Sequence, residues 1–155
     1  MKSIAHVYTQ ERDAAQAPWF LGVVTAVRAT GDQTQGAYSL FEQILPPGAG
    51  MPLHVHHNED ETFFVLEGTI TIWVGDQRIT GTQGTWVFAP RDIKHAFRAE
   101  GTETARLLIS LNPSGFENFI YALGEKNAPT APPDMEKVLP VARKYGVEIF
   151  GGFPD

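Results

Sequence analysis

The sequence predicts an all-β sandwich or barrel, because short strand-like runs fill most of the chain and helix-like patterns are confined to its end. Turn residues such as Gly-Asp, Pro-Pro-Gly and Thr-Gly separate the runs, a pattern typical of many short antiparallel strands. The runs lie at 20–29, 37–45, 51–56, 61–67, 69–74, 77–80, 85–89, 94–98 and 104–111. We expect a tight hairpin turn at Val74-Gly75-Asp76-Gln77, since Gly and Asp accept a positive φ.

Helical patterns begin after Leu111. Ser114-Gly115-Phe116-Glu117 has the form of a capping box, and apolar residues follow at helical spacing. A Pro-rich linker at 127–133 leads to a second helix at 134–145, ended by Gly146 and kinked or broken at Pro140. A length of 155 residues suits one domain at 1–155. Within it we expect a barrel at about 20–112 and a helical extension at about 113–155.

Composition excludes several classes of protein. The chain contains no cysteine, so neither disulfides nor thiolate metal sites are available. Its net charge of -6, with Lys and Arg scattered, argues against nucleic acid or an anionic membrane as the main partner. No stretch approaches the roughly 20 apolar residues of a membrane span, and the N-terminus lacks the apolar run of a signal peptide. We therefore expect a cytoplasmic protein.

Histidines concentrate in two short segments of the chain. His54 and His56 lie two residues apart on an expected strand, so both imidazoles project from one face about 6.6 Å apart. Glu61 follows closely, and His95 belongs to a second segment. Imidazoles with a carboxylate suit a divalent first-row metal. The alternative is that these histidines are ordinary surface residues of a polar loop.

The two segments resemble the paired motifs of the cupin superfamily. The first motif matches at every position checked, namely Gly48, His54, His56, Glu61 and Gly68. The second matches at Gly84, Pro90 and His95 but departs from the pattern at Asp92, where cupins have Gly, and at Ala99, where they have Asn. Because Asp tolerates a left-handed turn, Asp92 should keep the bend. The resemblance implies a double-stranded β-helix, the cupin jelly roll, with one or two short C-terminal helices.

The same resemblance implies a metal centre. His54, His56, Glu61 and His95 would hold one divalent ion (Fe, Mn, Ni, Co, Cu or Zn) and leave one or two positions for other ligands. Glu59 and Asp60 compete with Glu61 for the carboxylate role, and the cupin spacing to Gly68 selects Glu61.

Other histidines fall outside this ligand set. His57 should face away from the centre because it follows His56 directly on the strand. His6 has no partner nearby in sequence and is expected on the surface. Since a histidine must be neutral to bind a metal, affinity should fall below a pH of about 6.

Strand alternation predicts an aromatic pocket beside the centre. If Glu61 points inward, Phe63 and Val65 point the same way, and His95 brings Phe97 with it. The expected wall comprises Phe63, Val65, Trp86, Phe88, Phe97, Phe116 and Phe119. Any one of these residues could instead be ordinary barrel core. An apolar wall favours a hydrophobic or aromatic small-molecule substrate.

Four segments resemble bacterial single-domain cupins described as quercetin-dioxygenase-like, namely Ala29-Thr30-Gly31, Pro46-Pro47-Gly48, His95-Ala96-Phe97-Arg98 and Gly115-Phe116-Glu117. The likeness spans roughly residues 19–152. This resemblance implies a metal-dependent dioxygenase acting on a small aromatic or polyphenolic compound with dioxygen, with Glu61 as both ligand and catalytic base. The alternatives are a non-oxidative isomerase, lyase or cyclase, and a non-catalytic cupin that binds a small molecule. We expect a homodimer, with C-terminal helices that form a lid or dimer contacts, or that cover a sheet edge.

Overall fold

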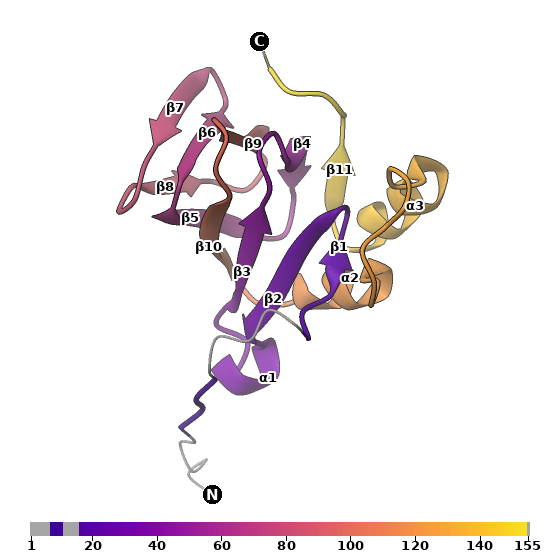
Figure 1. The fold of residues 1–155 in the computed structure, drawn as a ribbon. Helices are drawn as coiled ribbons and strands as arrows, with labels where there is room; N and C mark the ends of the chain where they lie inside the picture. The colour runs from indigo at the N-terminus through magenta and orange to yellow at the C-terminus, as the bar shows by residue number, and fades with distance from the viewer. Residues whose placement is uncertain (1–6, 11–15, 155) are drawn as a thin grey trace, which may run out of the picture.

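Two antiparallel sheets face each other across the core (Figure 1). The computed structural model describes residues 7–10 and 16–154. The first sheet has the strand order β1-β2-β3-β10-β5-β8, and the second has the order β11-β4-β9-β6-β7. The strands are β1 (Trp19–Phe20), β2 (Val23–Ala29), β3 (Ser39–Leu45), β4 (Gly50–His56), β5 (Asp60–Glu67), β6 (Thr69–Val74), β7 (Gln77–Gly81), β8 (Trp86–Ala89), β9 (His95–Glu100), β10 (Ala105–Asn112) and β11 (Val147–Ile149). The expected all-β jelly roll is confirmed.

Two expected turns take the conformations that their residues favour. Val74 pairs with Gln77 across a two-residue hairpin turn, in which Gly75 has a φ of 55°. Asp92 has a φ of 64°, so it adopts the left-handed bend that cupins give to Gly. Both predictions are confirmed, because Gly and Asp adopt a positive φ at little cost in free energy.

The structure differs from the expected elements at both ends of the barrel. The run at 20–29 is divided into β1 and β2, because Leu21 and Gly22 both have a positive φ. A short helix that the sequence analysis did not predict, α1 (Gly31–Thr34), follows β2. Thr30 begins α1 with a reciprocal capping box to Gln33. Strand β11, also not predicted, pairs with β4 and extends the second sheet.

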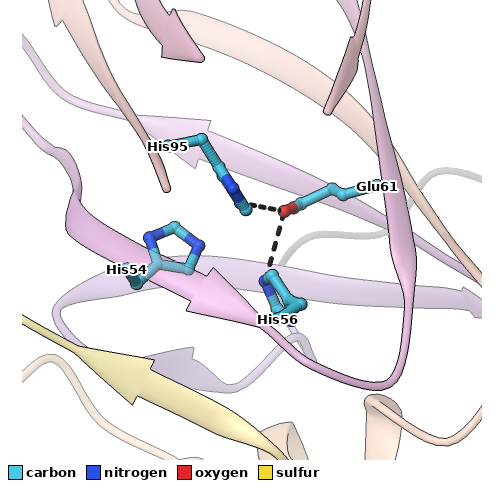
Figure 2. Close-up of side chains that lie close together, drawn as sticks. All are labelled: His54, His56, Glu61 and His95. Carbon is cyan, nitrogen blue, oxygen red and sulfur yellow. Dashed lines mark hydrogen bonds and ion pairs between the residues drawn. The ribbon is translucent and has the colours of Figure 1, made fainter. Parts of the chain in front are cut away.

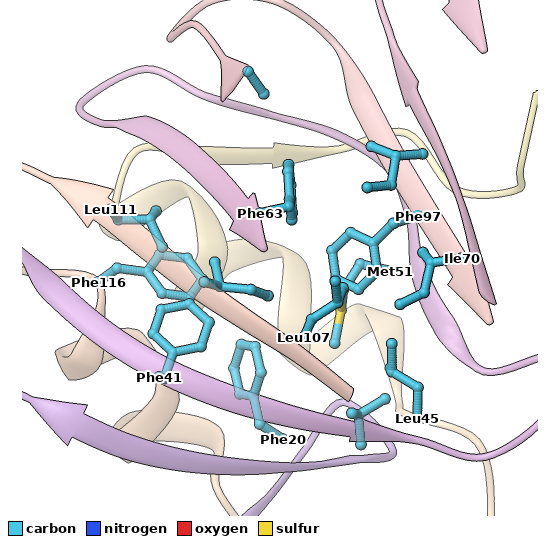
Figure 3. Close-up of a cluster of buried hydrophobic side chains, with 14 of the residues drawn as sticks. Phe20, Phe41, Leu45, Met51, Phe63, Ile70, Phe97, Leu107, Leu111 and Phe116 are labelled. Atoms are coloured by element: carbon cyan, nitrogen blue, oxygen red, sulfur yellow. The ribbon is translucent and has the colours of Figure 1, made fainter. Parts of the chain in front are cut away.

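The apolar core lies between the sheets (Figure 3). Alternate residues of facing strands point into it, so Phe63 and Val65 of β5 are fully buried, as is Leu107 of β10. Helix α2 (Glu117–Leu123) closes one end of this core. There the ring of Phe119 lies edge-on to Phe20, at a centroid distance of 5.1 Å.

The predicted capping box at Ser114 is wrong. The N-cap of α2 is Phe116, which makes no side-chain cap hydrogen bond. The carboxylate of Glu117 is buried, and it accepts hydrogen bonds from the backbone N–H groups of Gly31 at 2.7 Å and Gly115 at 2.9 Å. It also accepts one from the hydroxyl of Ser39. Gly31 and Ser39 from other segments, together with the nearby Gly115, take the place of the partner that the motif predicts.

The second C-terminal helix, α3 (Met135–Lys144), forms where a helix was expected. Asp134 caps it by accepting a hydrogen bond from the backbone N–H of Glu136 at 3.1 Å. Pro140 lies inside α3 without ending it, so the expected break is absent. No helix of residues 7–10 and 16–154 is long and apolar enough to cross a membrane.

Candidate metal centre

Four side chains that can bind metal converge between the two sheets (Figure 2). His54 and His56 lie on β4 and His95 on the adjacent β9, while Glu61 comes from β5 of the opposite sheet. One candidate ligand atom from each residue lies within 4.8 Å of all the others. All of these side chains are buried. The sequence analysis named the same residues, and the fold brings them together.

Backbone carbonyls fix the orientation of two imidazoles. Nδ1 of His54 lies 2.7 Å from the carbonyl oxygen of Pro52, and Nδ1 of His95 lies 3.0 Å from that of Ile93. A carbonyl oxygen can only accept, so both Nδ1 atoms carry the proton. Nε2 of each ring is then free to bind a metal, which is the usual arrangement for metal-binding histidines.

The arrangement of donor atoms requires a cation. Oε2 of Glu61 lies 2.6 Å from Nε2 of His95 and 3.2 Å from Nε2 of His56. With Nδ1 protonated, a neutral His95 would direct a lone pair at the carboxylate, and the two groups would repel each other. Either an additional proton or a metal ion must therefore lie among these atoms. Nitrogen and oxygen donors without sulfur suit a divalent first-row metal, so the residues present fit such an ion.

Electrostatics assign different charge states to the ligands. Burial, reinforced by His95 and His56, holds the pKa of His54 well below its usual value. Burial alone would also lower the pKa of His56, but the charges of Glu61 and Glu59 outweigh it and raise this pKa to about 9. Burial would raise the pKa of Glu61, yet His56 and His95 outweigh burial and lower it. Without metal, the cluster therefore holds a proton on His56 beside an ionised Glu61.

The two neighbouring polar residues His57 and Asp60 face away from the centre. His57 is exposed, with its Nδ1 2.6 Å from Oδ1 of Asp92 and its Nε2 3.2 Å from Oε2 of Glu148. Asp60 pairs with Arg91 through both carboxylate oxygens at 3.1 Å. Alternation along β4 explains the position of His57. His6 lies outside the described residues.

Glu59 is the buried carboxylate that the sequence analysis considered only as a rival ligand. Its Oε2 lies 3.5 Å from Nδ1 of His56, on the side of the ring that faces away from Glu61. Neither atom has a hydrogen-bond partner among the described residues, and both are buried. Glu59 is thus the acceptor available to the Nδ1 proton of His56, in the place that a carbonyl takes at His54 and His95.

A mainly apolar cavity of about 200 Å³ adjoins the centre and includes His54, His56 and Glu61 in its wall. Three of the residues expected in the pocket, Phe97, Phe116 and Phe119, line it. Phe63 and Val65 lie on the same inward face as Glu61 but are packed in the core beside the cavity. The ring centroid of Phe63 lies 6.0 Å from that of His95.

Trp86 and Phe88 lie outside the cavity, which corrects the expectation that both belong to its wall. Their exposed fractions are 62% and 44%. The register explains this, because β5 pairs with β8 so that Phe63 faces Val87 and Glu61 faces Ala89. Val87 and Ala89 therefore point inward, and the two aromatic residues between them point outward. All residues of β8 are apolar, so alternation could not be read from its sequence.

The sequence analysis missed several residues that line the cavity. Gln43 is a polar residue on the inner face of β3. Its position between Phe41 and Leu45, two residues from each, was the signal that could have placed it there. The others are Phe20, Leu21, Phe41, Met51, Pro52, Ile109, Pro133, Met135, Val147 and Ile149.

Two facing antiparallel sheets with three histidines and a glutamate between them define a cupin-type jelly roll. Residues 41–111 match the family model of the cupin domain, so this part of the chain is a cupin domain. Solved structures share the fold. One is a predicted oxalate decarboxylase from Thermotoga maritima, with a TM-score of 0.62, 18% identity and coverage of 68% of this chain and 99% of the other. Another is the plu4264 protein from Photorhabdus luminescens, with a TM-score of 0.60, 15% identity and coverage of 90% and 98%.

Two curated proteins are similar in sequence. Quercetin 2,3-dioxygenase from Bacillus subtilis is 30% identical over 106 residues, which are 62% of this chain and 31% of that protein. Polyketide synthase CurC from Streptomyces cyaneus is 30% identical over 82 residues, which are 52% of this chain and 53% of that protein. The chain thus matches about a third and about half of the length of these relatives.

Proposed function

We propose that this protein is a metal-dependent dioxygenase that acts on a small aromatic or polyphenolic compound with dioxygen. The observation that carries the proposal is a buried cluster of three histidines and a glutamate that opens directly onto an apolar cavity. Similarity to the quercetin dioxygenase from Bacillus subtilis supports the oxidative chemistry.

The ligands of the proposed metal are His54, His56, Glu61 and His95. When bound, one divalent ion (Fe, Mn, Ni, Co, Cu or Zn) would supply a Lewis acid or a redox centre beside the substrate. The chain itself supplies the binding of the substrate ring. Phe97, Phe116 and Phe119 contact that ring and exclude water from the cavity.

Glu61 takes the proton of the substrate hydroxyl at its carboxylate, in addition to its role as a ligand. Burial by itself raises the pKa of this carboxyl group, and it is the positive charge of His56, with the hydrogen-bond contact of His95, that lowers the pKa in the proton-bound cluster. A bound divalent ion would also favour the ionised carboxylate, so Glu61 would act as a base on loosening from the ion, where burial raises its pKa.

Anaerobic mixing of metal-loaded protein with candidate substrates, followed by measurement of dioxygen uptake, tests the proposal. Flavonols, catechols and β-diketones are tried with Fe, Mn, Co, Ni and Cu. We expect uptake with one of these classes, loss of uptake in His54→Ala, and normal uptake in the control His57→Ala, whose histidine lies outside the centre. No uptake with any substrate and metal would rule out the proposal.

A second candidate is a non-oxidative isomerase, lyase or cyclase in which the metal would polarise a carbonyl group. A relative named as a polyketide synthase keeps this candidate beside the first. The mark of the second candidate is turnover of an enolisable substrate without dioxygen, so the same anaerobic experiment distinguishes the two. Binding without turnover under either atmosphere would indicate a non-catalytic cupin. A homodimer and a cytoplasmic location stay predictions, and measurement of the mass in solution checks the first.

A further inference from the structure

Gln43 introduces a polar group into an otherwise apolar part of the cavity. It lies on β3 with Phe41 and Leu45 on the same face, and its exposed fraction is 2%. It lines the cavity that adjoins the metal centre. A buried amide in such a wall is costly unless each of its polar atoms is hydrogen-bonded.

Hydrogen bonds fix the orientation of this amide. Nε2 of Gln43 donates to Oγ1 of Thr25 at 3.2 Å, and the Thr25 hydroxyl donates to the carbonyl oxygen of Val23 at 3.2 Å. Because the hydroxyl proton is used, Thr25 accepts from the amide and cannot donate to it at the same time. Oε1 of Gln43 is left as a buried acceptor with no hydrogen-bond partner among the described residues and with almost no exposed surface, so a ligand in the cavity reaches it only with a small shift of the side chain.

The size of the cavity limits what can reach this acceptor. Its volume is about 200 Å³. A dry cavity of about 150 Å³ holds benzene, whereas drug-sized ligands occupy roughly 300 Å³ or more. The enclosed part of the site therefore suits a single ring with small substituents, and a compound with several rings would extend beyond it.

We propose that Oε1 of Gln43 accepts a hydrogen bond from the ligand and thereby selects its class. The ligand is a single-ring phenol that carries a second hydroxyl group remote from the oxygen that faces the metal centre. The contact of the ligand with the metal rests on the proposed function. The contact of the ligand with Gln43 rests only on the hydrogen bonds of the amide. A ring without the second donor would leave the acceptor buried and unpaired, so the site should discriminate against it.

Binding of matched phenols to the Zn²⁺-loaded protein without dioxygen tests the proposal, because Zn²⁺ has no redox chemistry. Calorimetry compares 1,3-dihydroxybenzene with 3-methylphenol and 1,4-dihydroxybenzene with 4-methylphenol. The 1,2-isomer is left out because both of its hydroxyls could reach the metal. We expect one dihydroxybenzene to bind about tenfold more tightly than its methyl analogue.

The variant Gln43→Met keeps the length of the side chain and removes the acceptor. It should abolish or reverse the preference, while the control Gln77→Met, at an exposed glutamine on β7, should keep it. If Gln43→Met does not fold, the comparison of the paired phenols on the wild-type protein still tests whether the site prefers a second hydroxyl group.

Equal binding of both members of each pair to the wild type, or no binding of either pair, overturns the proposal. The first outcome would mean that trapped water satisfies Gln43. A preference that persists in Gln43→Met also overturns it. A Gln43-dependent preference without any dioxygen uptake would instead overturn the dioxygenase proposal and leave this one standing.

Discussion

Each imidazole of the cluster has an oxygen near its Nδ1, at 2.7 Å for His54, 3.0 Å for His95 and 3.5 Å for His56. For His54 and His95 this oxygen is a backbone carbonyl, which no substitution of a side chain removes. For His56 it is the carboxylate of Glu59, so this ligand alone depends on a replaceable side chain for its orientation. The sequence could predict the ligands from their spacing, but it could not show which side of His56 Glu59 occupies.

Glu59→Gln tests this dependence. The amide keeps a weaker acceptor but loses the charge that favours the correct tautomer, so metal affinity should fall about 10- to 100-fold. Competition with a chelating dye measures the affinity. The matched control is Asp60→Asn, which removes the neighbouring charge from an exposed pair with Arg91 and should leave the affinity unchanged. Equal affinities of wild type and Glu59→Gln would contradict the role of Glu59.

The pH dependence of metal binding follows from His56. An ordinary histidine would place the loss of affinity below a pH of about 6, but in this cluster the pKa of His56 is raised to about 9. Below that pKa the metal must displace the proton of His56. The logarithm of the affinity should therefore rise by about one unit per pH unit up to a pH near the pKa, then level off. Zn²⁺ titrations between pH 6 and 10 check this, and a plateau from pH 7 would refute it.

Strands and helices with a clear local sequence pattern were predictable, whereas those that depend on contacts with residues distant in sequence were not. The strands of the barrel and α3 formed where periodicity and turn residues indicated. Strand β11 has only three residues, and it exists because the edge of β4 offers unpaired backbone groups. Glu117 likewise caps no helix of its own, since Gly31 and Ser39 lie far from it in sequence.

Glu117 joins α1, β3 and the start of α2, so Glu117→Gln should destabilise the fold. The loss at pH 7 should be about 1–3 kcal/mol, because buried donors lose a charged acceptor. Burial raises the pKa of Glu117, but hydrogen bonds from Ser39 and Gly31 outweigh it and lower this pKa below its ordinary value of 4.5. The contribution is therefore present above pH 4.5 and lost as pH falls through the folded pKa.

Urea unfolding at pH 7 and at acidic pH measures the effect of Glu117→Gln. The exposed Glu103→Gln serves as the control and should match the wild type. A loss of the same size at both pH values would show that the charge of Glu117 is not the cause.

On the scale of the whole molecule, the C-terminal segment from β11 onward forms part of the wall of the cavity. Strand β11 lies directly beside the ligand strand, with Val147 opposite His56 and Ile149 opposite His54. Past β11, Lys94 lies over the ring of Phe150 at 4.1 Å, and Arg98 lies over that of Phe153 at 5.2 Å. Sequence periodicity could not reveal this wall, because its contacts join residues about 55–95 positions apart.

The metal centre also joins the two sheets, because Glu61 belongs to one and the three histidines to the other. An ion held there binds only the folded chain, so a free concentration of 100 times Kd should stabilise the protein by about 2.7 kcal/mol. For a chain of 155 residues this corresponds to a rise in Tm of roughly 5–10 °C. Thermal unfolding with Zn²⁺ and with a chelator measures the difference. His54→Ala should lose the rise and His57→Ala should keep it, whereas equal Tm values for the wild type in Zn²⁺ and in chelator would show that no ion links the sheets.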